Sequence, residues 1–377
     1  MADQGQQRTL LLAGGGTAGH VNPMLALAAE IRRRHPEVVL RALGTATGLE
    51  ADLVPAAGIE LVELPKVPLP RRPSMDVLRF PGRWRTAMAV ARQALIGADA
   101  VVGFGGYVAT PAYMAARTAQ VPIIVHEQNA RPGLANRVGA RFAAAVGVTF
   151  AGTSLPGARV VGLPLRPAIA DLAQARIDDP AAARAQGAAE LGLDPDRPVL
   201  VVSGGSLGAV RLNQAVGQAA ASLLATGAQV VHLTGVGKDD EVRQLLSRAG
   251  VDSGDYHVMP YLDSMQHALA CADLMVCRAG AGTVCELAAL GIAGVYVPLP
   301  IGNGEQRLNA APVVQAGGGL MVDDDDLTEQ WVGSEVVALL VEPARLARMA
   351  SRAAAVGVRD GAARLAGLVE VAAGWRA

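Results

Sequence analysis

Two glycine-rich turns, half a chain apart, constrain the fold of this sequence most. In each turn a short apolar run breaks into small residues and then into a helical pattern. Residues 10–13 precede Gly14-Gly15-Gly16-Thr17-Ala18-Gly19-His20, and residues 199–203 precede Gly204-Gly205-Ser206. A short apolar run is typical of a buried parallel strand, and the N–H groups that open the next helix favour bound phosphate. The sequence therefore predicts two halves built alike.

Apolar runs alternate with helical patterns along the whole chain of 377 residues. We expect strands at residues 10–13, 38–43, 100–102, 122–126, 199–203, 229–234, 257–260, 274–277 and 294–298, and a helix at 23–34 with Pro23 in its first turn. Such alternation predicts an α/β fold with two doubly wound, Rossmann-like domains. Gly162, Pro164 and Pro167 follow the last strand of the first half, so we predict domains at 1–163 and 164–354, with a C-terminal helix at 355–377 that packs back on the first.

Composition excludes several classes of protein. The net charge of −1 gives no overall field that would recruit nucleic acid, so no nucleic-acid partner is expected. Three widely spaced cysteines form neither a C-x-x-C pair nor a disulfide framework, which favours a reducing cytoplasm. No apolar run reaches the roughly 18 residues of a spanning helix, and the first residues lack a signal-peptide pattern. The run of acids at 323–326 is interpreted as an exposed loop rather than a metal site.

The chain matches two known phosphate-binding motifs only in part, one at the first turn and one near Lys238. Gly14, Gly16 and Gly19 satisfy G-x-G-x-x-G, but the second predicted strand ends without the acidic residue that would hold a ribose of NAD. Lys238 is followed by Asp239, so no P-loop is present. Hydride transfer and P-loop phosphotransfer are therefore disfavoured.

Polar side chains gather where strands of the first half end. His20 stands at a helix N-terminus, which keeps an imidazole neutral and suits a general base; the alternative is a capping or packing histidine. Gly105-Gly106-Tyr107 and His126-Glu127-Gln128-Asn129 each follow a strand, at the edge where open α/β sheets bind ligands. Glu127 is a second candidate base, and the sequence does not decide between it and His20. A polar turn capped by Asn129 is the other interpretation.

The second half offers groups for a sugar. Glu286 lies in the first turns of a helix after the strand at 274–277, where its carboxylate would accept both hydrogens of a ribose diol or cap the helix; the two interpretations stay open. Gln306 and Asn309 follow another strand and are predicted to bind sugar hydroxyls.

A basic segment at residues 66–92 stands apart from the rest of the chain. Its basic residues surround apolar ones, and the patch that we predict at a membrane surface consists of Arg72, Leu78, Arg79, Phe80, Arg83, Trp84 and Arg85. Each basic residue near anionic lipid contributes about 1 kcal/mol. The alternative is a solvated basic loop whose apolar residues pack into the domain.

Taken together, ordered landmarks over nearly the whole chain resemble the MurG family of N-acetylglucosaminyltransferases. The landmarks are Gly15-Gly16-Thr17-Ala18-Gly19-His20, Leu43-Gly44-Thr45, Glu50-Ala51-Asp52-Leu53-Val54-Pro55, Gly105-Gly106-Tyr107-Val108, His126-Glu127-Gln128-Asn129, Gly204-Gly205-Ser206, Arg278-Ala279-Gly280 and Glu305-Gln306 with Asn309. The resemblance implies a GT-B fold and an inverting transfer of GlcNAc from UDP-GlcNAc to the 4-hydroxyl of a lipid-linked muramoyl pentapeptide (lipid I), without cofactor or metal. It also implies a peripheral protein on the cytoplasmic face of the cell membrane, bound to anionic lipids, and leaves contact with other cell-wall synthesis proteins open.

The resemblance also assigns roles to residues of this chain. It places His20 and Glu127 in the reaction, Glu286 on ribose and Gln306 on GlcNAc. The remaining positions implied for substrate binding are Thr17, Ala18, Gly19, Tyr107, Asn129, Arg166, Ser206, Leu262, Ala281, Gly282, Thr283, Val284, Cys285 and Asn309.

The chain departs from the family pattern at four positions. Ala18 replaces a second glycine, Leu207 a glutamine, Leu163 an asparagine and Glu305 a glutamine. Ala18 narrows the acceptor loop, and Glu305 puts in doubt an amide hydrogen bond to the sugar. Two rival functions remain: a hydrolysing UDP-GlcNAc 2-epimerase of the same fold, and a non-catalytic nucleotide-sugar-binding or scaffold protein.

Overall fold

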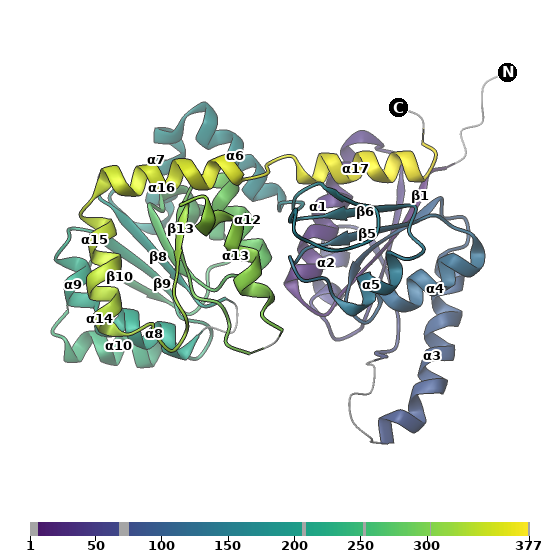
Figure 1. Ribbon diagram of the computed structural model, residues 1–377, viewed down its shortest axis with the longest axis horizontal. Coiled ribbons are helices and arrows are strands. Elements are labelled where there is room, and N and C mark those ends of the chain that lie inside the picture. The colour runs from purple at the N-terminus through teal and green to yellow at the C-terminus, as the bar shows by residue number, and fades with distance from the viewer. Residues whose placement is uncertain (1–6, 68–74, 206–208, 252–253, 302, 376–377) are drawn as a thin grey trace. The chain divides into compact units, whose positions relative to one another are not determined.

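The computed structural model describes residues 7–67, 75–205, 209–251, 254–301 and 303–375, with side chains for all of these except 75–79. The chain divides into two compact units (Figure 1). Unit 1 consists of Met1–Pro167 with Asp360–Ala377, and unit 2 of Ala168–Arg359. The predicted boundaries stood at 163 and 355.

Unit 1 is built on a parallel sheet that, within the described residues, has seven strands in the order β3-β2-β1-β4-β5-β6-β7. The strands are β1 (Thr9–Gly14), β2 (Val39–Gly44), β3 (Glu60–Glu63), β4 (Ala100–Gly105), β5 (Ile123–Glu127), β6 (Ala145–Val148) and β7 (Ala158–Val160). Leu10 pairs with Leu40 of β2 and with Ala100 of β4. The strand order reverses between β1 and β4, and ligands of open α/β sheets bind at the carboxyl ends of such strands.

Helices cover both faces of this sheet. They are α1 (Ala18–Arg34), α2 (Glu50–Ala56), α3 (Met75–Ala94), α4 (Ala109–Ala119), α5 (Leu134–Gly139) and α17 (Gly361–Ala372). Side chains alternate along β1, so that Leu10 and Leu12 pack with α1, α2 and α17, whereas Leu11 and Ala13 pack with α3 and α4. Helix α17, the last of the chain, lies beside α1 (Figure 1).

Unit 2 repeats this plan with a parallel sheet for which the described residues give six strands in the order β10-β9-β8-β11-β12-β13. Its strands are β8 (Val199–Ser203), β9 (Gln229–Leu233), β10 (Tyr256–Met259), β11 (Leu274–Cys277), β12 (Ala293–Tyr296) and β13 (Gly319–Met321). The strand order reverses between β8 and β11.

Helices surround this second sheet as well. They are α6 (Pro167–Asp178), α7 (Pro180–Leu191), α8 (Val210–Gln218), α9 (Ala220–Leu224), α10 (Asp239–Arg248), α11 (Met265–Cys271), α12 (Ala281–Leu290), α13 (Glu305–Gln315), α14 (Glu329–Trp331), a π-helical turn at Val332–Val336, α15 (Val337–Leu340) and α16 (Pro343–Val356). A core of buried aliphatic residues, among them Leu200, Val202 and Leu212, joins the helices to the sheet.

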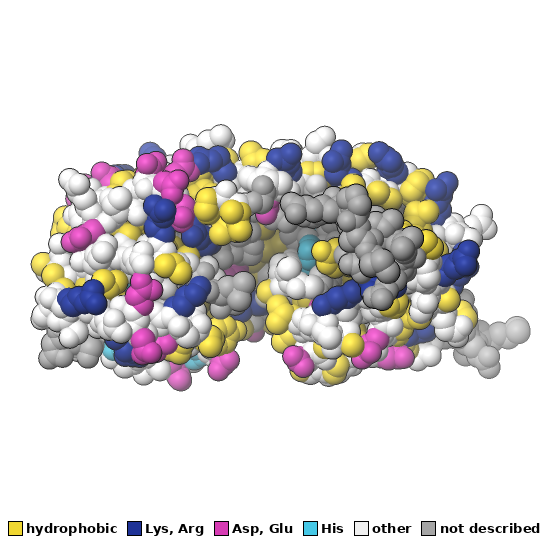
Figure 2. Space-filling view, turned by 90° about the horizontal axis from the view of Figure 1, so that it is seen from below, with side chains coloured by type: hydrophobic (Ala, Val, Ile, Leu, Met, Phe, Trp, Pro, Cys, Tyr) yellow, Lys and Arg dark blue, Asp and Glu magenta, His cyan; other side chains and the backbone are white. Residues whose placement is uncertain are grey.

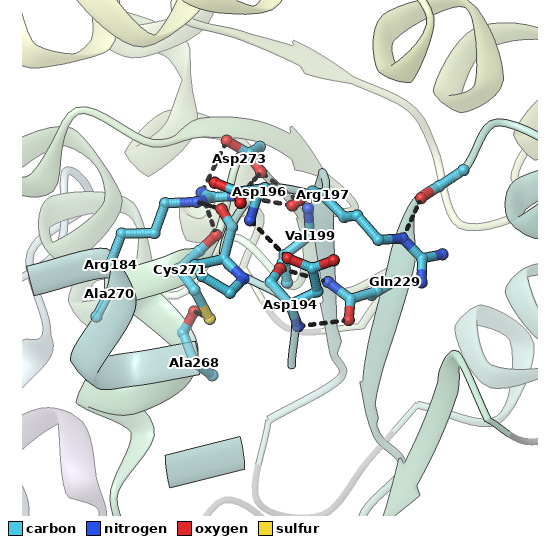
Figure 3. Close-up of polar contacts among 12 residues, drawn as sticks. Arg184, Asp194, Asp196, Arg197, Val199, Gln229, Ala268, Ala270, Cys271 and Asp273 are labelled. Atoms are coloured by element: carbon cyan, nitrogen blue, oxygen red, sulfur yellow. Dashed lines mark hydrogen bonds and ion pairs between the residues drawn. The ribbon is translucent and has the colours of Figure 1, made fainter. Parts of the chain in front are cut away.

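Two arginines and two carboxylates tie together the segments that enter the strands of unit 2 (Figure 3). Arg184 of α7 donates to both oxygens of Asp273, at 3.1 and 2.9 Å, and to the carbonyl of Cys271 at 2.7 Å. Asp273 also accepts from the N–H of Val199, and Arg197 forms an ion pair with Asp255 at 2.7 Å. These contacts lie where strands begin, at the edge opposite the glycine turn.

The predicted fold class and all nine predicted strands are confirmed. Strands β3, β6, β7 and β13 were not predicted. The predicted start of the first helix was wrong, because α1 begins at Ala18 and contains Pro23 in its interior. Proline there removes one helical hydrogen bond, a cost that burial of its ring against the core offsets. No helix among the described residues has the length and apolar character needed to span a bilayer.

Candidate active site

The glycine turn after β1 places His20 in the first turn of α1. Gly16 adopts a φ of +87°, and Thr17 precedes the helix in an extended conformation. The Nδ1 atom of His20 lies 3.1 Å from the carbonyl oxygen of Gly15 and 3.2 Å from the Thr17 hydroxyl. Because a carbonyl can only accept, Nδ1 carries the hydrogen and Nε2 of the neutral ring keeps its lone pair. The imidazole is thereby set up to accept a proton at Nε2.

The surroundings of His20 favour its neutral form. Burial lowers the pKa of His20 below its ordinary value of 6.5, and this effect exceeds the opposing ones. Those opposing effects are the hydrogen bond to Gly15 and the negative charges of Glu127 and Glu50. The imidazole is therefore uncharged near neutral pH, as a general base must be.

The glycine turn after β4 lies against the glycine turn after β1. Gly105 and Gly106 have φ angles of +101° and +79°. A Cβ atom at Gly105 would lie 3.1 Å from Nε2 of His20, and one at Gly106 would lie 2.5 Å from the carbonyl oxygen of Gly15. Only glycine fits this approach of the two turns. Tyr107, next in the chain, exposes 53% of its surface.

Glu127 ends β5 and is almost fully buried. One carboxylate oxygen accepts from the backbone N–H of Asn129 at 3.0 Å; the other accepts from the N–H of Gly133 at 3.0 Å and from the side chain of Asn136 at 2.9 Å. Asn136, on α5, accepts in turn from the hydroxyl of buried Tyr113 at 2.8 Å. Three N–H donors thus hold the carboxylate, which ties the loop after β5 to α5.

The other polar residues of this motif are largely structural. His126 is fully buried; its Nε2 donates to the carbonyl of Gly162 at 3.0 Å, and its Nδ1 accepts from Gln128 at 3.1 Å. Burial lowers the pKa of His126 to about 4. Asn129 is half-buried, and its carbonyl accepts from Thr153. Asn129 therefore remains a candidate for ligand contact, whereas His126 and Gln128 support the loop.

In unit 2 the predicted donor loop opens α12, after β11. Gly280 precedes this helix in an extended conformation, and as a glycine it carries no side chain to cap the N-terminus. Ala281 and Val284 are buried against the core, whereas Gly282, Thr283, Cys285 and Glu286 are half-buried. Burial raises the pKa of the Cys285 thiol to about 12, so it stays protonated. The side chain of Val284 is 1% exposed, so this residue could contact a ligand only through its backbone.

Residues after β12 reach the same edge of the second sheet. The side-chain oxygen of Gln306 accepts from the N–H of Leu299 at 2.9 Å. Asn309 is fully buried and donates to the carbonyl of Ala279 at 3.4 Å, which supports the turn before α12. Predicted contact of Asn309 with a sugar therefore does not agree with its burial. Leu262, after β10, is half-buried beside exposed Tyr261.

The acidic run at 323–326 is neither a metal cluster nor a wholly solvated loop. Asp324 forms ion pairs with Arg278 at 2.5 Å and with Arg211 of α8 at 3.3 Å, while Asp325 pairs with Arg211 and Asp323 with Arg307. Among the described residues no group of three or more His, Cys, Asp or Glu side chains is arranged to hold a metal ion. The run therefore joins α8, α13 and the turn before α12.

The structure gathers most predicted site residues at the carboxyl edges of the two sheets. Thr17, Ala18 and Gly19 are exposed at the start of α1, and Arg166 lies at the end of unit 1 rather than in the second half. Arg72 and Ser206 lie outside the described residues, as do the side chains of Leu78 and Arg79. Sequence reasoning assigned no role to Glu50, whose carboxylate accepts from Gly16, or to Asn136, which donates to Glu127; the available signal for Glu50 was an acid at the start of the helix that follows the second strand.

Phe80 and Trp84 of the predicted membrane patch are half-buried on α3. Their rings stack with centroids 6.0 Å apart and pack against the core of unit 1. Arg83 is half-buried and Arg85 exposed. Figure 2 shows Lys and Arg side chains next to hydrophobic ones on this part of unit 1. Of the basic residues whose side chains the structure describes here, Arg85 thus lies at the surface and Arg83 partly so, whereas Phe80 and Trp84 pack partly into the domain.

Family models match both units of the chain. Residues 10–148 match the glycosyltransferase family 28 N-terminal domain, and residues 199–365 match the glycosyltransferase family 28 C-terminal domain.

Curated relatives are similar over nearly their whole length. A UDP-N-acetylglucosamine–N-acetylmuramyl-(pentapeptide) pyrophosphoryl-undecaprenol N-acetylglucosamine transferase from Bifidobacterium adolescentis is 54% identical over 94% of this chain and 95% of the relative. The protein of the same name from Streptomyces avermitilis is 52% identical over 96% of this chain and 97% of the relative.

Solved structures share the architecture. The crystal structure of Acinetobacter baumannii MurG matches with a TM-score of 0.76 and 27% identity, covering 97% of this chain and 99% of that one. A UDP-GlcNAc 2-epimerase from Neisseria meningitidis matches with a TM-score of 0.69 over 96% of this chain and 99% of that one, but at 13% identity this likeness concerns the fold alone. With relatives above half identity over almost the entire sequence, the chain belongs to glycosyltransferase family 28, in its MurG group.

Proposed function

We propose that this protein transfers GlcNAc from UDP-GlcNAc to the 4-hydroxyl of undecaprenyl-pyrophosphoryl-MurNAc-pentapeptide, lipid I, and so forms lipid II for peptidoglycan synthesis. Relatives that carry this name at 54% identity support the substrates. The observation that carries the chemistry is the neutral imidazole of His20, whose Nδ1–H is held by Gly15 while Nε2 keeps its lone pair. Nε2 lies at the sheet edge where ligands of this fold bind.

In the proposed reaction His20 acts as the general base. Nε2 takes the proton of the acceptor 4-hydroxyl while that oxygen forms a bond to the anomeric carbon of GlcNAc. The bond from this carbon to the UDP oxygen breaks on the opposite face, so the product has inverted, β configuration. One displacement of this kind requires one base. Because three N–H groups already hold Glu127, we assign it to positioning the loop rather than to proton transfer.

Unit 2 is proposed to hold the donor. The half-buried side chain of Glu286 lies in the first turns of α12, where it would accept the ribose hydroxyls, and Gln306 is proposed to contact GlcNAc. The N-terminus of α12 and the cationic Arg166 would stabilise the leaving diphosphate without a metal ion. Ser206 is retained as a candidate phosphate contact.

We also propose peripheral binding to the cytoplasmic face of the membrane through the basic residues of α3. The surface position of Arg85 and the half-buried Arg83 support attraction to anionic lipid rather than deep insertion of Phe80 and Trp84. Co-sedimentation of the protein with anionic but not zwitterionic vesicles is expected; equal binding to both would contradict this assignment.

The transferase proposal is tested by UDP release from UDP-GlcNAc in the presence of EDTA, with and without lipid I. We expect release that depends on lipid I. His20→Ala should lower turnover about 10²- to 10⁴-fold and leave donor binding intact. His267→Ala, which alters a half-buried histidine of α11, serves as the matched control and should retain activity.

Other outcomes separate the rival functions. Release of UDP without acceptor would favour an epimerase or hydrolase, and no release under any condition would favour a binding or scaffold protein. Activity that EDTA abolishes would overturn the metal-independent mechanism, and full activity of His20→Ala would remove His20 as the base.

A further inference from the structure

Glu50 is a fully buried carboxylate at the start of α2, beside the glycine turn that carries His20. One of its oxygens accepts from the backbone N–H of Gly16 at 2.8 Å. The other accepts from the backbone N–H of Thr45 at 2.9 Å and from the Thr45 hydroxyl at 2.7 Å. A buried charge is tolerated only when hydrogen bonds of this kind replace its hydration. The carboxylate is therefore specifically accommodated at this point.

Three glycines leave the room that this carboxylate occupies. A Cβ atom at Gly15 would lie 2.5 Å from a carboxylate oxygen, one at Gly44 would lie 2.6 Å from Cγ, and one at Gly48 would lie 2.2 Å from the other oxygen. Burial alone would raise the pKa of Glu50, but the donors from Gly16 and Thr45 outweigh it and lower the pKa. Glu50 is thus ionised near neutral pH and packed too closely to change its position.

The same peptide group links Glu50 to His20. The N–H of Gly16, which donates to Glu50, and the C=O of Gly15, which accepts from Nδ1 of His20, belong to one peptide bond. A trans peptide is planar and points these two groups in opposite directions, so holding one fixes the other. Neighbouring hydrogen bonds also polarise one another. The negative charge therefore both orients the Gly15 carbonyl and strengthens it as an acceptor.

We propose that Glu50 is a positioning residue for the transfer reaction, which through the peptide between Gly15 and Gly16 holds His20 with its proton on Nδ1 and its lone pair on Nε2. The inference rests on the proposed role of His20 as the base. Glu50 would contact neither substrate. It would act as the buried acid of a His–acid pair, with one peptide group between the two.

The charges that face His20 give this arrangement a measurable signature. They are Glu50 from α2 and Glu127 from β5, and both raise the pKa of the imidazole against the larger effect of burial. Replacing Glu50 by a neutral residue removes one of these charges. The pKa of His20 should then fall further, which moves the acid limb of the activity profile to lower pH.

The test compares Glu50→Gln with Asp52→Asn, which neutralises an exposed acid of the same helix. Glutamine can accept from Thr45 or from the Gly16 N–H but offers no second acceptor, so the peptide loses its anchor. We expect kcat of lipid I glycosylation to fall about 10- to 100-fold, the KM for UDP-GlcNAc to change little, and the acid limb to move to lower pH. Glu50→Asp should restore the position of the limb, and Asp52→Asn should match the unaltered protein.

Two further measurements keep the proposal testable. The first does not depend on the Glu50 variants folding, and the second shows whether His20 is the base. In the unaltered protein, ¹⁵N chemical shifts of His20 should report the Nδ1–H tautomer; an Nε2–H tautomer would overturn the proposal. A folded Glu50→Gln protein with normal kcat and an unmoved limb would also overturn it. If His20→Ala remains fully active, the proposed base fails, and that result is read separately from the Glu50 variants.

Discussion

At the scale of single residues, the protonation state of His20 decides the expected pH dependence of the reaction. The base must be neutral, and burial holds its pKa below 6.5, so activity should be lost only as the pH falls through that lowered value. We expect kcat/KM for the acceptor, which reports the free protein's groups, to show an acid limb centred below 6.5 when it is measured from about pH 5 to about pH 8. A limb centred at or above 6.5 would contradict the assignment.

The same measurement needs a control for unfolding. His126 is buried with a pKa of about 4, whereas an exposed histidine titrates near 6.5. The unfolded chain therefore binds more protons below about pH 6.5, and the free energy of unfolding falls as the pH decreases from there toward 4. Circular dichroism at each pH separates this loss of fold from protonation of the base.

The sequence predicted the position of a site residue where that position follows from the neighbouring residues along the chain. The turn after β1 puts His20 at a helix N-terminus, and strand ends put Glu127 at the sheet edge. What each side chain contacts depends on segments far along the chain: Glu50 meets Gly16, and Asn309 is buried under the Ala279 carbonyl. A sequence pattern does not reveal such contacts, so the polar residue Asn309 was assigned to a sugar and Glu50 to nothing.

At the scale of elements, strand prediction succeeded for continuous apolar runs and failed for short or polar edge strands. β3 has the sequence Glu60-Leu61-Val62-Glu63 and lies at one edge of the sheet, and β7 lies at the other edge with its three residues exposed. Neither buries both faces, so neither needs the apolar run that marks a central strand. The four-residue inner strand β6 (Ala145–Val148) was missed as well, whereas the strands that end at the candidate site were all predicted.

The polar cluster of Arg184 should contribute to stability and not to the reaction, because it lies where strands of unit 2 begin. Arg184→Ala removes its hydrogen bonds to Asp273 and to the carbonyl of Cys271 and leaves these partly buried acceptors with fewer donors. We expect the free energy of unfolding of unit 2 to fall by about 2–4 kcal/mol in urea titrations. UDP-GlcNAc affinity of the folded protein should be unchanged.

Arg248→Ala, at an exposed position of α10, is the matched control and should change the unfolding free energy by less than about 0.5 kcal/mol. Equal stability of the Arg184 and Arg248 variants would mean that the cluster is dispensable. A large loss of donor affinity in a fully folded Arg184 variant would instead link this edge to the site.

At the scale of the whole molecule, the chain leaves unit 1 at Pro167 and returns to it at Asp360. Unit 1 is therefore completed by the last helix. Leu365 and Val369 of α17 are fully buried with α1 and the sheet, and Glu370 pairs with Arg34 and His35 at 3.0 Å. A helical C-terminus was predictable from its pattern, but the residue at which the chain changes units was not, since α16 and α17 are both amphipathic helices separated by a short segment.

Shortening the chain before Asp360 should therefore destabilise unit 1 and spare unit 2, whose core is formed by its own residues. Burial of Leu365 and Val369 contributes roughly 1.5–3 kcal/mol each, so the unfolding transition of unit 1 should lose about 3–6 kcal/mol. Calorimetry of the full and shortened chains checks this. Leu365→Ala should lower the same transition without truncation, whereas Val371→Ala, at a position 81% exposed on the same helix, should not. If shortening lowered both transitions equally, the two units would unfold as one, and α17 would stabilise the whole chain rather than unit 1.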